Sequence, residues 1–380
     1  MTNWRASQSV TAEDVEAFAR RIPADDENIN IIVQDVRTVQ ISAVARLVGL
    51  LARLRREGRD IRLHLDTGDP STGLRNDSRF WSFFSDELVG IALSTFCSSI
   101  LKKDGEDILR LIQSRQSKLE SDDPFRLSRG DRTTFPTRDE RPKIGPAPIL
   151  HSLLSGDRHV FAGGLLSTFT RSLNLPGLEA SATSQINRFV WEVLKNTQDH
   201  GRLGGGSPTA GIRFVEIRRF NTAVGDTRAL VGANDTELSG FINRTRKSRP
   251  ATPLVEITIA DSGPGIAATM AKSYDVYNAD LSVESNLIEE AFTRQGTSRR
   301  TTDPDAGGGL TMALEACNAL GGYISVRTGR SIFARSFDSA NNGPLVLESS
   351  DRILPHIDGT AISIVIPWGS PLPPPLFELS

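Results

Sequence analysis

The first part of the chain alternates between strand-like and helix-like hydrophobic patterns. Residues 42–56 carry apolar side chains every three or four positions, which predicts an amphipathic helix. A shorter helix is expected at residues 11–22, where Thr11 and Asp14 have the spacing of a helix N-terminus. Strands are expected at residues 28–36 and 60–65. Alternating strands and helices predict a small α/β module.

The second part shows a long helical stripe followed by strand patterns. Residues 184–197 place apolar side chains on one helix face. An alternating strand is expected at residues 254–259, an amphipathic helix at 311–322, and a closing strand after Thr360. The whole chain is therefore expected to be α/β, with two modules.

A charged segment with several prolines and no sustained period separates the modules at residues 113–148, and is typical of a linker or an extended surface segment. The predicted division is residues 1–112, 113–148, 149–370 and 371–380. The last ten residues are rich in proline, which favours an exposed polyproline tail. An inert tail and a site for a proline-recognising partner both fit it.

Composition narrows the classes of function. The chain has 380 residues and a net charge of −2, so no overall field attracts nucleic acid or anionic lipid. Its two cysteines, Cys97 and Cys317, form no zinc motif. No run reaches the roughly 18 to 20 apolar residues of a membrane span, and no signal peptide is evident. We expect a cytoplasmic protein without direct nucleic-acid or membrane binding.

Three polar residues share one face of the helix predicted from residue 184 onward. At 100° per residue, Glu192, Asn196 and Asp199 fall within about 60° of one another, and His200 follows. A solvated face and a functional site both fit this pattern.

Glycines follow the strand that ends near residue 259. Asp261 leads into Gly263, Gly265 and Ile266. A carboxylate beside glycines can accept a hydrogen bond from an exocyclic amine such as that of adenine. An ordinary glycine turn is the alternative.

A second glycine run, Gly307, Gly308 and Gly309, precedes Leu310 at the start of the predicted helix. Free amides at a helix N-terminus attract phosphate. The spacing is that of neither a Walker loop nor a dinucleotide-binding fingerprint.

Taken in order, the motifs ExxxNxxDH, DxGxGI, the glycine run and Gly359-Thr360 resemble the GHKL superfamily of gyrases, heat-shock chaperones, histidine kinases and mismatch-repair ATPases. The resemblance covers about residues 180–368. It implies a two-layer α/β sandwich of the Bergerat type that binds ATP and Mg²⁺.

The resemblance also implies roles for single residues. Glu192 would be the general base, and Asn196 the ligand of Mg²⁺. Asp261 would bind the adenine amine, with Gly263 and Gly265 leaving room for the base. The remaining expected ATP contacts are Asp199, His200, Ile266, Thr297, Ser298, Gly307, Gly308, Gly309, Leu310 and Thr360.

Residues 267–306 would form the ATP lid, in which Thr297, Ser298, Arg299 and Arg300 bind the γ-phosphate when the lid closes. A solvated basic loop is the alternative for that part. The family pattern GLGL is replaced here by Gly309-Leu310-Thr311-Met312, so the last glycine of the pattern is missing.

The first module resembles a STAS-type domain, the fold of anti-sigma-factor antagonists. Ser42 falls near the serine that is phosphorylated in such domains, although this chain has Gln40-Ile41-Ser42 where the family usually has Asp-Ser-Ser or Asp-Ser-Gly. A simple helix cap is the alternative.

An ATPase that switches a protein interaction by lid closure is therefore the leading interpretation. Its alternatives are an anti-sigma-type serine kinase and a nucleotide-binding scaffold without turnover. The protein partner is unidentified, and the resemblance allows a homodimer.

Overall fold

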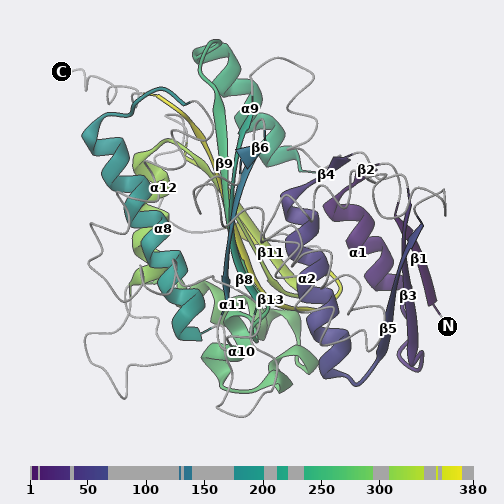
Figure 1. The fold of residues 1–380 in the computed structure, drawn as a ribbon. Helices are drawn as coiled ribbons and strands as arrows, with labels where there is room; N and C mark the ends of the chain where they lie inside the picture. Colours follow the sequence, from purple (N-terminus) through teal and green to yellow (C-terminus); the bar gives the residue numbers. More distant parts are fainter. Residues whose placement is uncertain are drawn as a thin grey trace.

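A computed structural model describes eleven stretches of the chain (Figure 1). They are residues 2–6, 9–34, 38–66, 128–129, 132–138, 175–200, 212–220, 235–293, 308–337, 348–349 and 353–369. Outside them lie the tail at 371–380, Cys97, Thr297, Ser298, Arg299, Arg300 and Gly307. Within the described helices, none is long and apolar enough to cross a membrane.

The centre of the molecule is an eight-stranded antiparallel sheet with the order β12-β11-β10-β13-β9-β8-β7-β6. Its strands are β6 (Ser128–Arg129), β7 (Arg132–Arg138), β8 (Ile212–Phe220), β9 (Leu254–Asp261), β10 (Tyr323–Gly329), β11 (Ser331–Ser336), β12 (Glu348–Ser349) and β13 (Ile357–Pro367). The middle strand β9 is buried along its whole length. Its polar residues Glu256 and Thr258 are buried too, so the alternation predicted at residues 254–259 does not mark a solvent-facing side of the strand.

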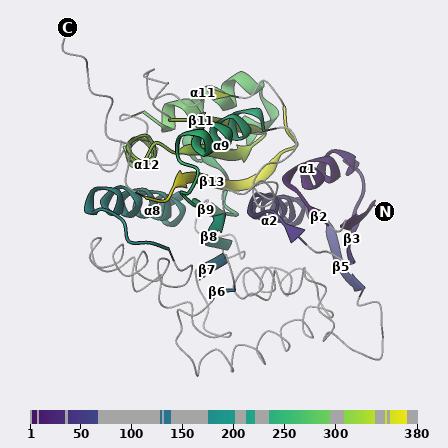
Figure 2. The same ribbon diagram turned by 90° about the horizontal axis from the view of Figure 1, so that it is seen from above.

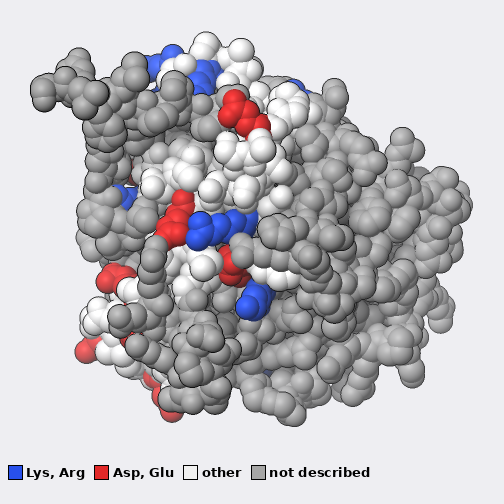
Figure 3. Space-filling view, turned by 90° about the vertical axis from the view of Figure 1, so that its left-hand side faces the viewer, with Lys and Arg blue, Asp and Glu red and all other residues white. Residues whose placement is uncertain are grey.

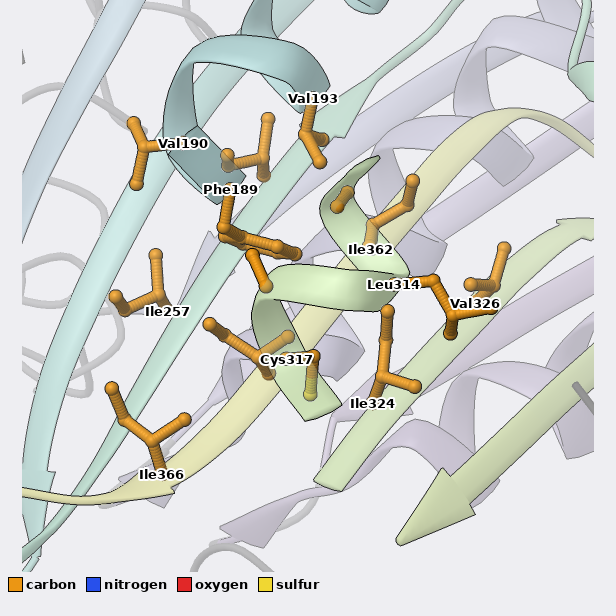
Figure 4. Close-up of a cluster of buried hydrophobic side chains, with 14 of the residues drawn as sticks. Phe189, Val190, Val193, Ile257, Leu314, Cys317, Ile324, Val326, Ile362 and Ile366 are labelled. Atoms are coloured by element: carbon orange, nitrogen blue, oxygen red, sulfur yellow. The ribbon is translucent and has the colours of Figure 1, made fainter. Parts of the chain in front are cut away.

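Two helices cover one face of this sheet, α8 (Ala180–His200) and α12 (Gly309–Ala319). Phe189 and Val193 of α8 meet Leu314 of α12 above the strands (Figure 4). Isoleucines from the strands complete the core, among them Ile257 and Ile362. The apolar stripe predicted in residues 184–197 is thus the face that packs on the sheet.

Three further elements lie between β9 and α12, namely α10 (Ile266–Ala271), the 3₁₀ helix η3 (Tyr274–Asn278) and α11 (Leu281–Ala291). Helix α9 (Thr236–Ser248) precedes β9 and packs near β11. Val276 and Ile288 are buried in the core. The first part of the segment expected as a lid therefore consists of packed helices.

The N-terminal unit is a small parallel β-α unit. Its sheet has the order β1-β3-β5, and a short second pair joins β2 to β4 in parallel. The elements are β1 (Thr2–Ala6), β2 (Ser9–Val10), α1 (Ala12–Arg21), β3 (Asn28–Gln34), β4 (Thr38–Val39), α2 (Ile41–Arg56) and β5 (Asp60–Asp66). Thr11 and Asp14 form the expected capping box, which confirms the start of the first helix.

Helix α2 lies between the two sheets (Figures 1 and 2). It packs against β13 and β9 on the face opposite to α8 and α12. At Gly49 a side chain would collide with the carbonyl oxygen of Asp358, so the backbones approach closely there. The N-terminal unit therefore supplies a layer of the larger structure.

Two expectations change in detail. Helix α2 begins at Ile41, and the carbonyl of Gln40 accepts bonds from Ala43 and Val44. Ser42 therefore lies inside the first turn. The helix-cap interpretation of Ser42 was wrong, because Gln40 holds the cap position. Residues 132–138, within the expected linker, pair with β8 in the central sheet.

Candidate functional site

The side chains of Glu192 and Asn196 meet the first residue of α12. A Cβ atom on Gly309 would lie 3.1 Å from Glu192 Oε2 and 3.1 Å from Asn196 Nδ2. These residues belong to motifs more than a hundred positions apart. The structure thus brings the carboxylate, the amide and the glycine run together at one place.

Local geometry explains this meeting. Positions four apart share one face of a helix, so Glu192 and Asn196 project together toward α12. Gly308 has φ +80° at the N-cap of α12, a conformation that favours glycine. No side chain caps the amides of α12 through Gly308. Backbone N–H groups at the start of this eleven-residue helix are the kind of donor that binds phosphate.

The polar face of α8 is partly buried. Glu192 is only 8% exposed, so the solvated-face interpretation is wrong for this residue. Asn196 Nδ2 is buried and has no hydrogen-bond partner among the described atoms. Rotating the amide group by half a turn would put its oxygen in the place of Nδ2. The amide of Asn196 can therefore offer a ligand either a donor or an acceptor at this place.

Asp199 and His200 form the last two residues of α8. Their side chains lie outside the described part of the structure. The roles expected for them stay predictions.

A second group of polar residues gathers where three strands end. Asp261 closes β9 and pairs directly with Thr360 on β13. The carboxylate of Asp261 is 9% exposed, and its Oδ1 accepts a 2.8 Å hydrogen bond from the amide of Gly263. Asp261 and Thr360 were expected in one pocket, and the strand register makes them neighbours.

Gly265 lies against the same group. Its φ is +83°, and an added Cβ would meet the Tyr277 hydroxyl and lie 2.9 Å from Thr328 Oγ1. Ile266, which follows, begins α10 and packs on the core. This part of the backbone therefore tolerates only glycine, as the motif predicted.

Thr328 is a site residue that the sequence analysis missed. Its hydroxyl accepts the amide hydrogen of Ile266 at 3.0 Å, donates to the carbonyl of Gly359 at 3.1 Å, and lies 3.2 Å from Thr360 Oγ1. It is fully buried. Its position opposite Thr360 comes from the pairing of β10 with β13, which no short motif encodes.

The helices α10 and α11 link the two groups of residues. Gly265 is the N-cap of α10, whereas Thr311 in the first turn of α12 donates a 2.8 Å hydrogen bond to the carbonyl of Phe292 just after α11. Leu310 packs beside these residues on the core. Glu284 of α11 is completely buried and pairs with Arg330 at 2.8 Å, which anchors this helix to the β10-β11 hairpin.

The described residues contain no group of three or more histidine, cysteine, aspartate or glutamate side chains that could hold a metal ion. Mg²⁺ in nucleotide sites commonly takes one or two protein ligands together with phosphate oxygens and water. Asn196 fits such a role through its amide oxygen, once the amide is rotated so that this oxygen takes the place of Nδ2 beside Gly309.

The outer face that carries α8 and α12 has mixed charge. Arg188 of α8 pairs with Glu315 of α12 at 3.0 Å. Across the middle of this face, the described acidic and basic side chains are intermingled (Figure 3).

Comparison with known proteins adds no relative to this picture. A scan against models of protein families finds no match, and searches of curated proteins and of solved structures find none either.

Proposed function

We propose that this chain is an ATP-binding, Mg²⁺-dependent ATPase of the GHKL type. Residues 180–368 would then be a Bergerat-type sandwich, and the N-terminal unit a STAS-like module. The proposal rests on the resemblance of four ordered motifs together with the geometry of the residues in them.

One observation carries the proposal furthest. Glu192 and Asn196 both face the missing side chain of Gly309, at the N-terminus of a helix. A helix N-terminus attracts phosphate, a buried carboxylate can accept a proton, and an amide oxygen can serve a hard cation. These three chemistries are the ones that cleavage of a terminal phosphate needs.

In the proposed reaction, Glu192 orients a water molecule and accepts its proton while the water oxygen bonds to the γ-phosphorus. The bond from that phosphorus to the bridging oxygen breaks, which yields ADP and inorganic phosphate. Backbone N–H groups of Gly309 and its neighbours would bind the phosphates. Asn196 would hold Mg²⁺, and charge neutralisation across the phosphates is what that ion supplies when bound.

At the other end of the site, Asp261 would accept a hydrogen bond from the adenine amine. Thr360 and Thr328 would line the same side of the base. Gly265 would let the base approach the backbone closely.

The output of the cycle is proposed to be a protein interaction that changes when the lid expected in residues 267–306 closes over the nucleotide. The partner is a protein of unidentified class, and a homodimer fits the resemblance.

Incubation of the whole protein with γ-labelled ATP and Mg²⁺ tests the proposal. We expect free labelled phosphate from the wild type, and its loss in Glu192→Ala with ATP binding retained. Label retained on protein, for example on Ser42, would instead identify a serine kinase. Binding without either product would identify a scaffold.

A further inference from the structure

The N-terminal unit contacts the backbone next to Thr360, which the proposed function places beside adenine. Arg56, the last residue of α2, forms two hydrogen bonds of 2.9 Å with the carboxylate of Asp358. Asp358 immediately precedes Gly359 and Thr360. It is 3% exposed, so this bidentate pair is largely shielded from water on the carboxylate side.

A second arginine reinforces the contact one turn earlier. Arg53 donates a 2.7 Å hydrogen bond to the carbonyl of His356. The guanidinium of Arg56 also lies 4.2 Å above the ring of Tyr274 in η3. Helix α2 therefore contacts both the start of β13 and the 3₁₀ helix η3.

Tyr277 joins this contact to the glycine loop. Its ring centroid lies 4.0 Å from that of His356, and its hydroxyl donates a 2.7 Å hydrogen bond to the carbonyl of Pro264. The same hydroxyl faces the position that a side chain on Gly265 would occupy. Tyr277 is 7% exposed, so it has little freedom to move away.

We propose that Tyr277 is a positioning residue for the loop Pro264 to Ile266, and that Arg56 acts through it so that the N-terminal unit sets the affinity for nucleotide. The inference rests on the proposed ATP site. The chain of contacts runs from Arg56 to Asp358 and His356, then to Tyr277 and Pro264. Because coupling is reciprocal, bound nucleotide in turn favours the docked N-terminal unit.

The contacts distinguish this role from simple stabilisation. Among the described residues, the side chain of Arg59, three positions after Arg56, bonds only to the carbonyls of Pro23, Ala24 and Asp26 and to Glu57, all in the N-terminal unit. Arg59→Ala is therefore a control that perturbs the same unit and reaches the path to Tyr277 only indirectly, because Glu57 also pairs with Arg53 at 3.3 Å.

Equilibrium ATP binding with a double-mutant cycle tests the proposal. We expect Arg56→Ala to weaken ATP binding by about fivefold or more, and Arg59→Ala by no more than about twofold. Tyr277→Phe keeps the ring against His356 and removes only the hydroxyl. The effect of Arg56→Ala should shrink in the Tyr277→Phe background, since both changes act on one path.

Amide exchange in the absence of nucleotide gives a second readout. Arg56→Ala and Tyr277→Phe should both speed exchange at Ile266, while Arg59→Ala should not. Far-ultraviolet circular dichroism checks that each variant is folded. A turnover assay should show a raised KM and little change in kcat, because Glu192 is untouched.

The outcomes separate the two proposals. If the wild type shows no saturable ATP binding, the proposed function fails and this inference fails with it. If the wild type binds ATP and Arg56→Ala matches Arg59→Ala, only the inference is overturned. An Arg56→Ala effect of unchanged size in the Tyr277→Phe background would also overturn it.

Discussion

Thr360 lies directly opposite Asp261 across the antiparallel pair of β13 and β9. The pairing places a hydroxyl beside a nearly buried carboxylate at the end of a fully buried strand. Under the proposed function, this carboxylate and this hydroxyl recognise the polar edge of adenine.

Replacement of Gly309 tests the junction between α8 and α12. Gly309→Ala would place a methyl group 3.1 Å from Glu192 Oε2 and Asn196 Nδ2, so we expect loss of ATP turnover by about tenfold or more. The change is measured as kcat/KM, with Gly177→Ala as control because its Cβ would meet no atom within 4 Å. Equal activity of the two variants would argue against a phosphate site at Gly309.

Thr328, which no motif indicated, should contribute to the proposed adenine site beside Thr360. Thr328→Val keeps the shape but removes the acceptor for the amide of Ile266. Leaving that buried amide unpaired costs about 1–3 kcal/mol. We expect lower stability in denaturant unfolding together with weaker ATP binding, and a loss of stability alone would place Thr328 outside the pocket.

The buried pair between the two units should be strongly coupled. Arg327 and Glu16 are each 3% exposed and lie 2.9 Å apart. Arg327→Met leaves the Glu16 carboxylate without its closest partner and should cost about 3–5 kcal/mol of unfolding free energy. Adding Glu16→Leu should recover only part of that loss, because Arg46, which lies 3.4 Å from Glu16, would lose this partner.

The surface pair of Arg188 and Glu315 is the matched comparison. Its side chains are 31% and 23% exposed, and Arg188→Met should cost at most about 1 kcal/mol. Equal losses in Arg188→Met and Arg327→Met would contradict the interpretation of the Glu16 pair as a buried coupling between units.

His356 should make stability depend on pH. Burial, followed by the nearby charges of Arg53 and Arg56, lowers the pKa of His356 from 6.5 to about 2. Between these values the unfolded chain binds a proton that the folded chain does not, so stability falls as pH falls below about 6.5.

Denaturant unfolding from pH 8 to pH 5 measures this effect. One such group contributes at most about 1.4 kcal/mol per pH unit. His356→Gln should flatten the dependence below pH 6.5 and leave the slope above it unchanged. Identical slopes for wild type and variant would contradict the neutral state of His356 in the folded protein.

Much of the fold followed from local patterns. The stripe of residues 184–197 predicted a helix with one buried face, and Thr11 marked the start of α1 correctly. Helix α12 begins at Gly309, two residues before the expected start, because glycine at the N-cap supplies the left-handed turn. Such patterns predict features that depend on residues close together in the sequence.

Features that depend on long-range pairing were not predictable. Strand β7 lies in a charged, proline-containing segment and becomes a strand by pairing with β8. The bond between Arg327 and Glu16 spans 311 positions. Thr328 reaches Thr360 only through the register of β10 and β13. For the candidate site, the sequence named the residues of both groups except Thr328, whereas the structure supplied their contacts.

Binding of ATP by the whole protein is the central claim, and calorimetric titration with ATP and Mg²⁺ tests it most directly. We expect saturable binding by the wild type and a loss of about tenfold or more in Asp261→Asn, which removes a buried charged acceptor. Asp280→Asn, at an exposed N-cap without a side-chain hydrogen bond, should bind ATP like the wild type. No saturable binding by the wild type, or equal affinity in Asp261→Asn, would contradict the assignment of an ATP site.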